Sequence, residues 1–92
     1  MATHYVPSIT ATQYPDFQQV CGGRLPNTHD EWRWTEEHNH RDLRVSGHKI
    51  IPVPVEPGEL KQYCQEMGCQ ADGTALDNLA FKKGGEMERF SL

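Results

Sequence analysis

The chain has 92 residues, of which 36% are hydrophobic, and its formal net charge at pH 7 is −4. This length predicts one domain, 1–92, with a modest core. Dedicated nucleic-acid binders usually carry a basic excess, so the acidic balance argues against that class. Three cysteines, no N-terminal apolar run and no stretch of membrane-spanning length favour a reducing cytoplasm without membrane attachment.

The N-terminal segment 1–27 is rich in Thr, Pro, Gly and Gln and is predicted to be largely irregular. A short extended stretch is compatible with Tyr5, Val6 and Ile9. Residues 16–21 can form one or two helical turns that end at Gly22-Gly23. The residues expected to face inward from those turns are Phe17, Val20 and Cys21.

Residues 28–47 allow two interpretations, of which the first is a helix. Thr28 and Glu31 have the spacing of a capping box, which favours a helix from there to Gly47. On such a helix the side chain of Trp32 lies nearly opposite that of Trp34, so a single core cannot bury both. One tryptophan would then be exposed, as is typical of an interface anchor.

The second interpretation, which we favour on the sequence, is a pair of strands. In strands, Trp32 and Trp34 share one face and are both expected in the core, and Leu43 and Val45 share another. Residues 37–40 and 46–48 would form polar turns. The fold class is then α+β, with a small antiparallel meander at 31–36, 41–46 and 49–55.

The third of these strands, 49–55, contains two prolines. Pro52 and Pro54 lack backbone donors on the same lateral edge, while the donors of the intervening residues point to the other edge. The strand can therefore pair on one side only, as an edge strand. In the favoured register Ile51 pairs with Leu43, and Val45 lies opposite Lys49.

Two helices are predicted after this strand, at 57–67 and 75–83. Pro57 suits a first helical position, Gly68 suits a left-handed cap, and Thr74 can cap the second helix with Asp77 near its positive end. Gly84-Gly85 is expected to end the second helix, leaving 84–92 as a flexible tail. The apolar stripes expected to face inward are Leu60, Tyr63, Cys64 and Met67 in the first helix, and Leu76, Leu79 and Ala80 in the second.

Catalytic and metal chemistry is poorly supported. The string His38-Asn39-His40 is not a nuclease motif, because the residues of that motif are dispersed over a ββα unit. Zinc ligand types are present but not in pairs with metal-ligand spacing, and Cys64 is expected to be an inert buried thiol. We predict no catalytic residue, no metal site and no cofactor. The zinc candidates considered are His29, His38, His40, His48, Cys21, Cys64 and Cys69.

A basic patch is the predicted partner-binding site. It consists of Arg33, Arg41, Arg44 and Lys49, which can touch an RNA or protein backbone. The alternative is a solvated face balanced by nearby Glu and Asp.

The portion 49–83 resembles short prophage-type sequences, and the size, acidity and lack of a catalytic motif are similar to anti-CRISPR proteins, particularly inhibitors of type I surveillance complexes. This resemblance implies a phage-encoded inhibitor in the host cytoplasm that binds a CRISPR ribonucleoprotein and blocks target-DNA hybridisation or nuclease recruitment. These proteins share no common motif, so no site residue is carried over. The alternatives are a small metal or thiol enzyme and a homodimeric structural module.

Overall fold

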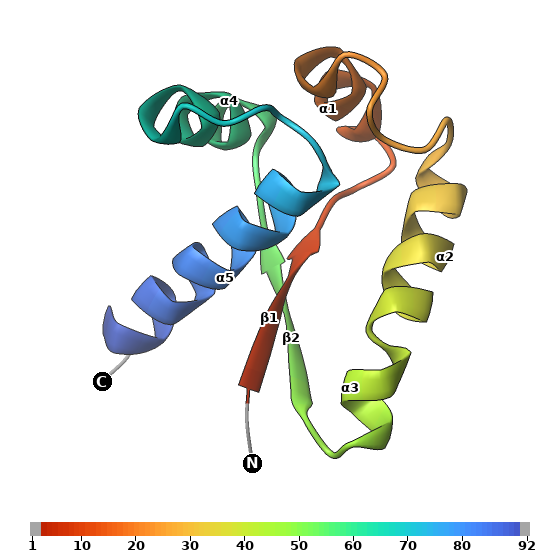
Figure 1. Ribbon diagram of the computed structural model, residues 1–92, viewed down its shortest axis with the longest axis vertical. Coiled ribbons are helices and arrows are strands. Elements are labelled where there is room, and N and C mark those ends of the chain that lie inside the picture. Colours follow the sequence, from red (N-terminus) through yellow and green to blue (C-terminus); the bar gives the residue numbers. More distant parts are fainter. Residues whose placement is uncertain (1–2, 91–92) are drawn as a thin grey trace.

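The computed structural model describes residues 3–90, and the side chains of residues 3–87 (Figure 1). It contains two strands and five helices, which confirms the predicted α+β class. Their order is β1 (Thr3–Ser8), α1 (Tyr14–Cys21), α2 (His29–Asn39), α3 (Arg41–Val45), β2 (Lys49–Pro54), α4 (Pro57–Met67) and α5 (Gly73–Phe90).

The sheet is a parallel pair, β1 with β2, and the predicted antiparallel meander is wrong. Ile51 pairs with Tyr5 of β1 rather than with Leu43. Parallel strands need a long crossover between them, and α1, α2 and α3 together form it. The residues assigned to two further strands are therefore part of the connection.

The edge character of β2 follows from its prolines, as predicted. The Val55 N–H donates to the Ser8 carbonyl oxygen (3.4 Å), so the donor edge of β2 faces β1. Pro52 and Pro54 then turn their donor-free edge away from the pair. In β1 the same alternation points Pro7 outward. Both outer edges of the two-stranded sheet thus lack donors at prolines.

Residues 28–47 contain helices and no strand, so the capping-box interpretation is right in type, although the helix is divided at His40 into α2 and α3. The Thr28 side chain accepts a hydrogen bond from the Glu31 N–H (3.1 Å). Trp32 is 5% exposed, whereas Trp34 is 67% exposed, so the expectation that both lie in the core is wrong. In a helix these two positions lie on nearly opposite sides, so the core can bury only one of the two rings.

Over its described residues, 3–27, the N-terminal segment is more regular than predicted. The extended stretch is β1, and the helical turns expected at 16–21 begin earlier and form α1. Phe17 and Cys21 are buried and Val20 packs against the core at partial burial. Gly22 ends α1 in the left-handed conformation, with φ of 58°.

Helix α4 has the predicted bounds, with Pro57 in its first turn and a left-handed cap at Gly68. A capping box between Glu56 and Glu59 strengthens its start. Leu60 and Cys64 are buried and Tyr63 is partly buried. Met67, at the last turn, is instead exposed.

Helix α5 starts earlier and runs further than the predicted 75–83. Its cap is Asp72, whose carboxylate accepts from the Ala75 N–H (2.9 Å), rather than Thr74. The helix continues through Gly84-Gly85 to Phe90, so most of the expected tail, 84–92, is helical; residues 91–92 lie outside the described residues. The predicted inward stripe of Leu76, Leu79 and Ala80 is buried.

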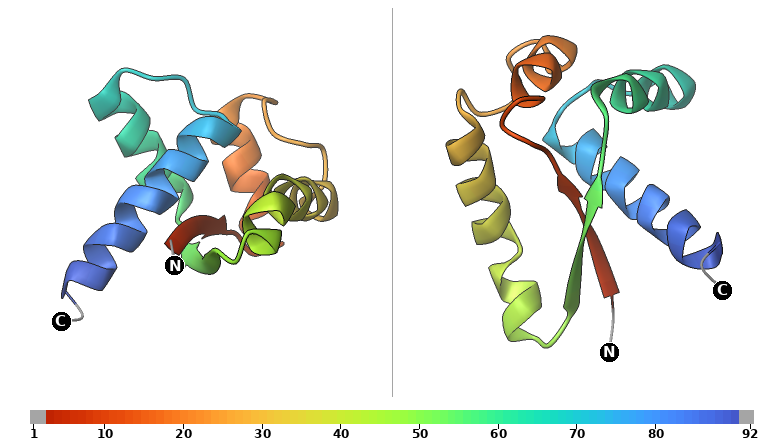
Figure 2. Two further views of the ribbon diagram at one scale, coloured as in Figure 1. Left: turned by 60° about the horizontal axis from the view of Figure 1, so that its bottom comes forward. Right: turned by 180° about the vertical axis from the view of Figure 1, so that it is seen from behind.

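The core lies where α5 covers the strand pair and α1 and α4 close one end. Helix α5 contacts both strands and α4, and α4 also contacts α1. Figure 2 shows α5 and the α2–α3 pair on opposite sides of the strands. No helix among the described residues is both long and apolar enough to cross a bilayer.

Candidate functional site

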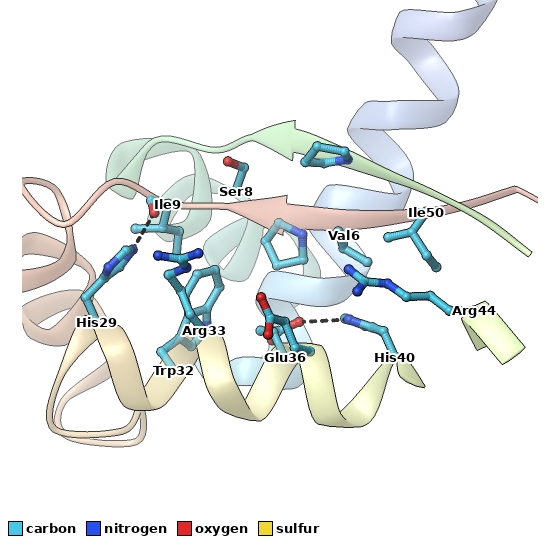
Figure 3. Close-up of a pocket in the computed structure, with 13 residues that line it drawn as sticks. Val6, Ser8, Ile9, His29, Trp32, Arg33, Glu36, His40, Arg44 and Ile50 are labelled. Carbon is cyan, nitrogen blue, oxygen red and sulfur yellow. Dashed lines mark hydrogen bonds and ion pairs between the residues drawn. The ribbon is translucent and has the colours of Figure 1, made fainter. Parts of the chain in front are cut away.

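A groove of about 400 Å³ lies between α2–α3 and the two strands (Figure 3). Its strand side includes Val6, Ile50 and Pro52, from the face of the sheet opposite α5, and its helix side carries the polar residues of α2 and α3.

The end of the groove near α1 is closed by aromatic rings. His29 Nε2 donates to the Ile9 carbonyl oxygen (2.6 Å), which pins the start of α2 to the end of β1. The His29 ring stacks on Trp32, with ring centroids 5.9 Å apart. These contacts fix the position of α2 beside the sheet.

The four basic residues predicted to bind a partner do not form one patch at the groove. Arg33 and Arg44 line it, whereas Arg41 and Lys49 lie outside its lining; all four side chains are exposed. The proposed basic contact is thus divided between the groove and the neighbouring surface. Partner binding by these residues stays a prediction.

An acid–imidazole cluster lies at the helix side of the groove, made of Glu36, His40 and Asp77. Donor atoms of the three residues all lie within 4.8 Å of one another. Glu36 and His40 are one helical turn apart, with Glu36 Oε2 3.5 Å from His40 Nδ1 (Figure 3), and Asp77 comes from the first turns of α5. His4 of β1 faces the cluster, its ring centroid 5.4 Å from that of His40.

The protonation of the cluster is shifted by burial. Burial, together with the neighbouring Asp77 carboxyl, raises the pKa of Glu36 to about 8. Burial also raises the pKa of Asp77. The pKa of His40 is lowered, first by burial and then by the charges of His4 and Arg44. At neutral pH the cluster therefore holds a neutral imidazole, and a proton on Glu36 separates two carboxyl groups that would otherwise repel each other.

The zinc candidates from the sequence do not converge on one point. His40 alone among them belongs to the cluster found in the described residues. His38 lies on the outer side of α2, and Cys21 and Cys64 are buried in the core. Burial raises the pKa of both thiols, to about 11 for Cys64, so neither is a nucleophile at neutral pH.

The outer face of α2–α3 carries a second distinctive feature. The Trp34 and His38 rings are stacked, with centroids 5.2 Å apart and planes 5° from parallel. Val45, 80% exposed, and the exposed Arg41 follow in α3. The His40 N–H donates to the Glu36 carbonyl oxygen and the Arg44 N–H donates to the His40 carbonyl oxygen, which joins α2 to α3 at His40.

Sequence reasoning missed Glu36, Asp77 and His4. The four-residue spacing of Glu36 and His40 is a signal, but it places two donors on one face only in a helix. Asp77 was assigned a helix-dipole role and instead turns toward α2. Its contact with Glu36 joins residues far apart in the chain, and neither local pattern predicts it.

No protein-family model, curated protein or solved structure matches the chain.

Proposed function

We propose that this is a non-catalytic binding protein that engages a macromolecular partner through the outer face of α2–α3, here defined by Trp34, His38, Arg41 and Val45. The observation that carries the proposal is the exposure of Trp34, 67%, on a helix whose other tryptophan is buried. An indole is a costly group to leave in water, and tryptophan and arginine are enriched among residues that dominate binding energy.

The stacking of Trp34 on His38 supports this role. It holds the indole in one orientation before binding, so less side-chain entropy is lost in a complex. Arg41 is exposed in α3, whereas Arg33 and Arg44 line the groove and Lys49 lies outside its lining. In the proposal these basic residues belong to a polar rim that extends from the aromatic anchor toward the groove, and a polar rim is the usual surround of a protein interface.

The narrower form of the proposal is an inhibitor of a bacterial type I CRISPR ribonucleoprotein that acts in the host cytoplasm. Its support is the resemblance in size, acidity and lack of a catalytic motif, with the net charge of −4. Surfaces that hold target DNA are positively charged, so an acidic protein is attracted to them. The inhibitor would occlude that surface, and its arginines could contact the guide RNA.

Binding of the purified protein to an immobilised type I surveillance complex tests the proposal. We expect Trp34→Ala to weaken binding by at least about tenfold, as expected for an interface anchor. Met67→Ala, which removes an exposed apolar side chain from α4, is the matched control and should bind like the wild type.

Arg41→Glu combined with Arg44→Glu tests the basic rim. We expect weaker binding with an unchanged folded state, and unchanged affinity would show that these arginines are solvated surface. Lys61→Glu, an exposed charge reversal on α4, is the control. Light scattering of the free protein separates partner binding from self-association: a dimer abolished by Trp34→Ala would assign this face to a homodimeric module instead.

A further inference from the structure

We propose that Glu36, His40 and Asp77 form a binding site for a divalent first-row transition-metal ion, with Zn²⁺ as the representative ion, that ties α2 to α5. The site is separate from the outer face of α2–α3 and does not depend on the proposed function. Of these three residues, only His40 is among the zinc candidates from the sequence, and it was not paired there with Glu36 or Asp77.

The donor spacing fits a metal centre. Zinc binds carboxylate oxygen and imidazole nitrogen at about 2.0–2.2 Å, so two ligands of a tetrahedral ion lie roughly 3.4 Å apart. The observed separation of Glu36 Oε2 and His40 Nδ1 is 3.5 Å, and all three donors fall within 4.8 Å. Small side-chain movements bring the third donor into range.

The buried carboxyl oxygens also favour a cation at this place. Glu36 Oε2 and Asp77 Oδ1 are both inaccessible and accept from no N–H or hydroxyl group of the described residues, so the hydrogen bond left to the pair is a proton shared between the two carboxyl groups. The His40 side chain is nine-tenths buried and is directed at Glu36. A buried acceptor without a donor is costly, and two facing carboxyl groups need a proton or a cation between them.

The groove gives the ion access to the site, and the donor atoms determine which metal ions can bind. Glu36 and His40 line the groove, so an ion can reach them from solvent. An imidazole in the donor set disfavours Mg²⁺ and Ca²⁺, which take oxygen ligands, and suits zinc and its transition-metal neighbours. Three protein ligands leave a fourth position for water in the tetrahedral geometry that zinc prefers.

Titration of untagged, chelator-stripped protein with ZnCl₂ by calorimetry at pH 7.5 tests the site. We expect one Zn²⁺ per chain, a rise in the melting temperature, and no comparable effect of MgCl₂. The ion replaces a shared proton, so binding should release protons and weaken as the pH falls. The groups that set this dependence are Glu36 and His40 of the α2 segment, Asp77 of α5, His4 of β1 and Arg44 of α3.

Glu36→Gln and Asp77→Asn identify the ligands. Each variant should weaken zinc binding by at least about tenfold, the lower range for disturbed metal sites. Each should also raise the melting temperature of the metal-free protein, because an amide can donate to the remaining carboxylate. A purely structural role for either residue predicts the opposite change in melting temperature.

Glu37→Gln is the matched control, since it makes the same carboxyl-to-amide replacement at the adjacent groove residue, which is exposed. Equal losses in Glu36→Gln and Glu37→Gln would show diffuse attraction and overturn the site. A titration without stoichiometric zinc would also overturn the site, and the cluster would then be a carboxyl pair that shares a proton. Zinc binding that survives Asp77→Asn and is lost in His38→Gln would overturn it as well.

Discussion

Gly84 of α5 lies directly against the ring of Tyr5 in β1, so closely that a Cβ atom at position 84 would overlap the ring. This close approach explains why α5 does not end at Gly84-Gly85. The glycine is a contact surface, and the helix continues because its packing on β1 compensates for the weak helix propensity.

Gly84→Ala should therefore destabilise the protein, although alanine is the better helix former. Overpacking typically costs about 1–3 kcal/mol, and the propensity gain of about 1 kcal/mol offsets part of it. Urea unfolding measures the difference. Gly85→Ala is the control: no atom lies within 4 Å of its added Cβ, so it should stabilise by up to about 1 kcal/mol. Equal effects at both positions would contradict the close packing.

The start of α5 gives a second prediction. Asp72→Ala removes the carboxylate that accepts from the Ala75 N–H and should lower the free energy of unfolding by about 1 kcal/mol. Thr74→Ala, at the residue that the sequence favoured as the cap, should change it by less than about 0.5 kcal/mol. If denaturant unfolding showed a larger loss for Thr74→Ala than for Asp72→Ala, Thr74 would be the cap.

The two tryptophans of α2 should differ sharply in stability. Trp32→Ala removes a buried ring and should cost about 3–5 kcal/mol, whereas Trp34→Ala should stay within about 0.5 kcal/mol. Guanidinium unfolding followed by circular dichroism measures both. A large cost at Trp34 would mean that its ring supports the fold and is not reserved for a partner.

Stability should fall as the pH rises toward 8. Glu36 has a pKa of about 8 in the folded chain and near 4.5 when unfolded, so between these values the folded state binds the extra proton. Its contribution is greatest below the unfolded pKa and is lost as the pH rises through the folded one. The raised pKa of Asp77 acts in the same direction.

Measurements with EDTA between pH 6.5 and 8, above the lowered pKa of His40, isolate this effect. Glu36→Gln should flatten the dependence. Wild-type stability that is flat over this range would show that Glu36 is ionised in the folded protein.

Features set by neighbouring residues could be predicted from the sequence. Pro57, the apolar stripe and Gly68 define α4 locally. The alternation of backbone N–H groups along a strand determines which edge of β2 lacks a donor at Pro52. The pairing partner of β2 could not be read this way, because β1 lies at the other end of the crossover. The residues just before β2 are its nearest possible partner in the sequence, and the predicted hairpin with them is wrong.

The error over residues 28–47 also concealed the acid–imidazole cluster. As strands, Glu36 and His40 belong to a strand end and a turn; as a helix, they share a face. The choice rested on burying every large apolar residue, whereas the chain leaves Trp34 and Val45 in solvent. An apolar side chain opposite the buried stripe of a helix is thus no argument against the helix.

Target-DNA binding by a purified type I surveillance complex, measured with the protein added at increasing ratios, tests the proposed inhibition. We expect the wild-type protein to abolish DNA binding near one equivalent, Trp34→Ala to restore it, and Met67→Ala to inhibit like the wild type. Undiminished DNA binding in the presence of excess wild-type protein would contradict the inhibitor, and full inhibition by Trp34→Ala would contradict the assigned face.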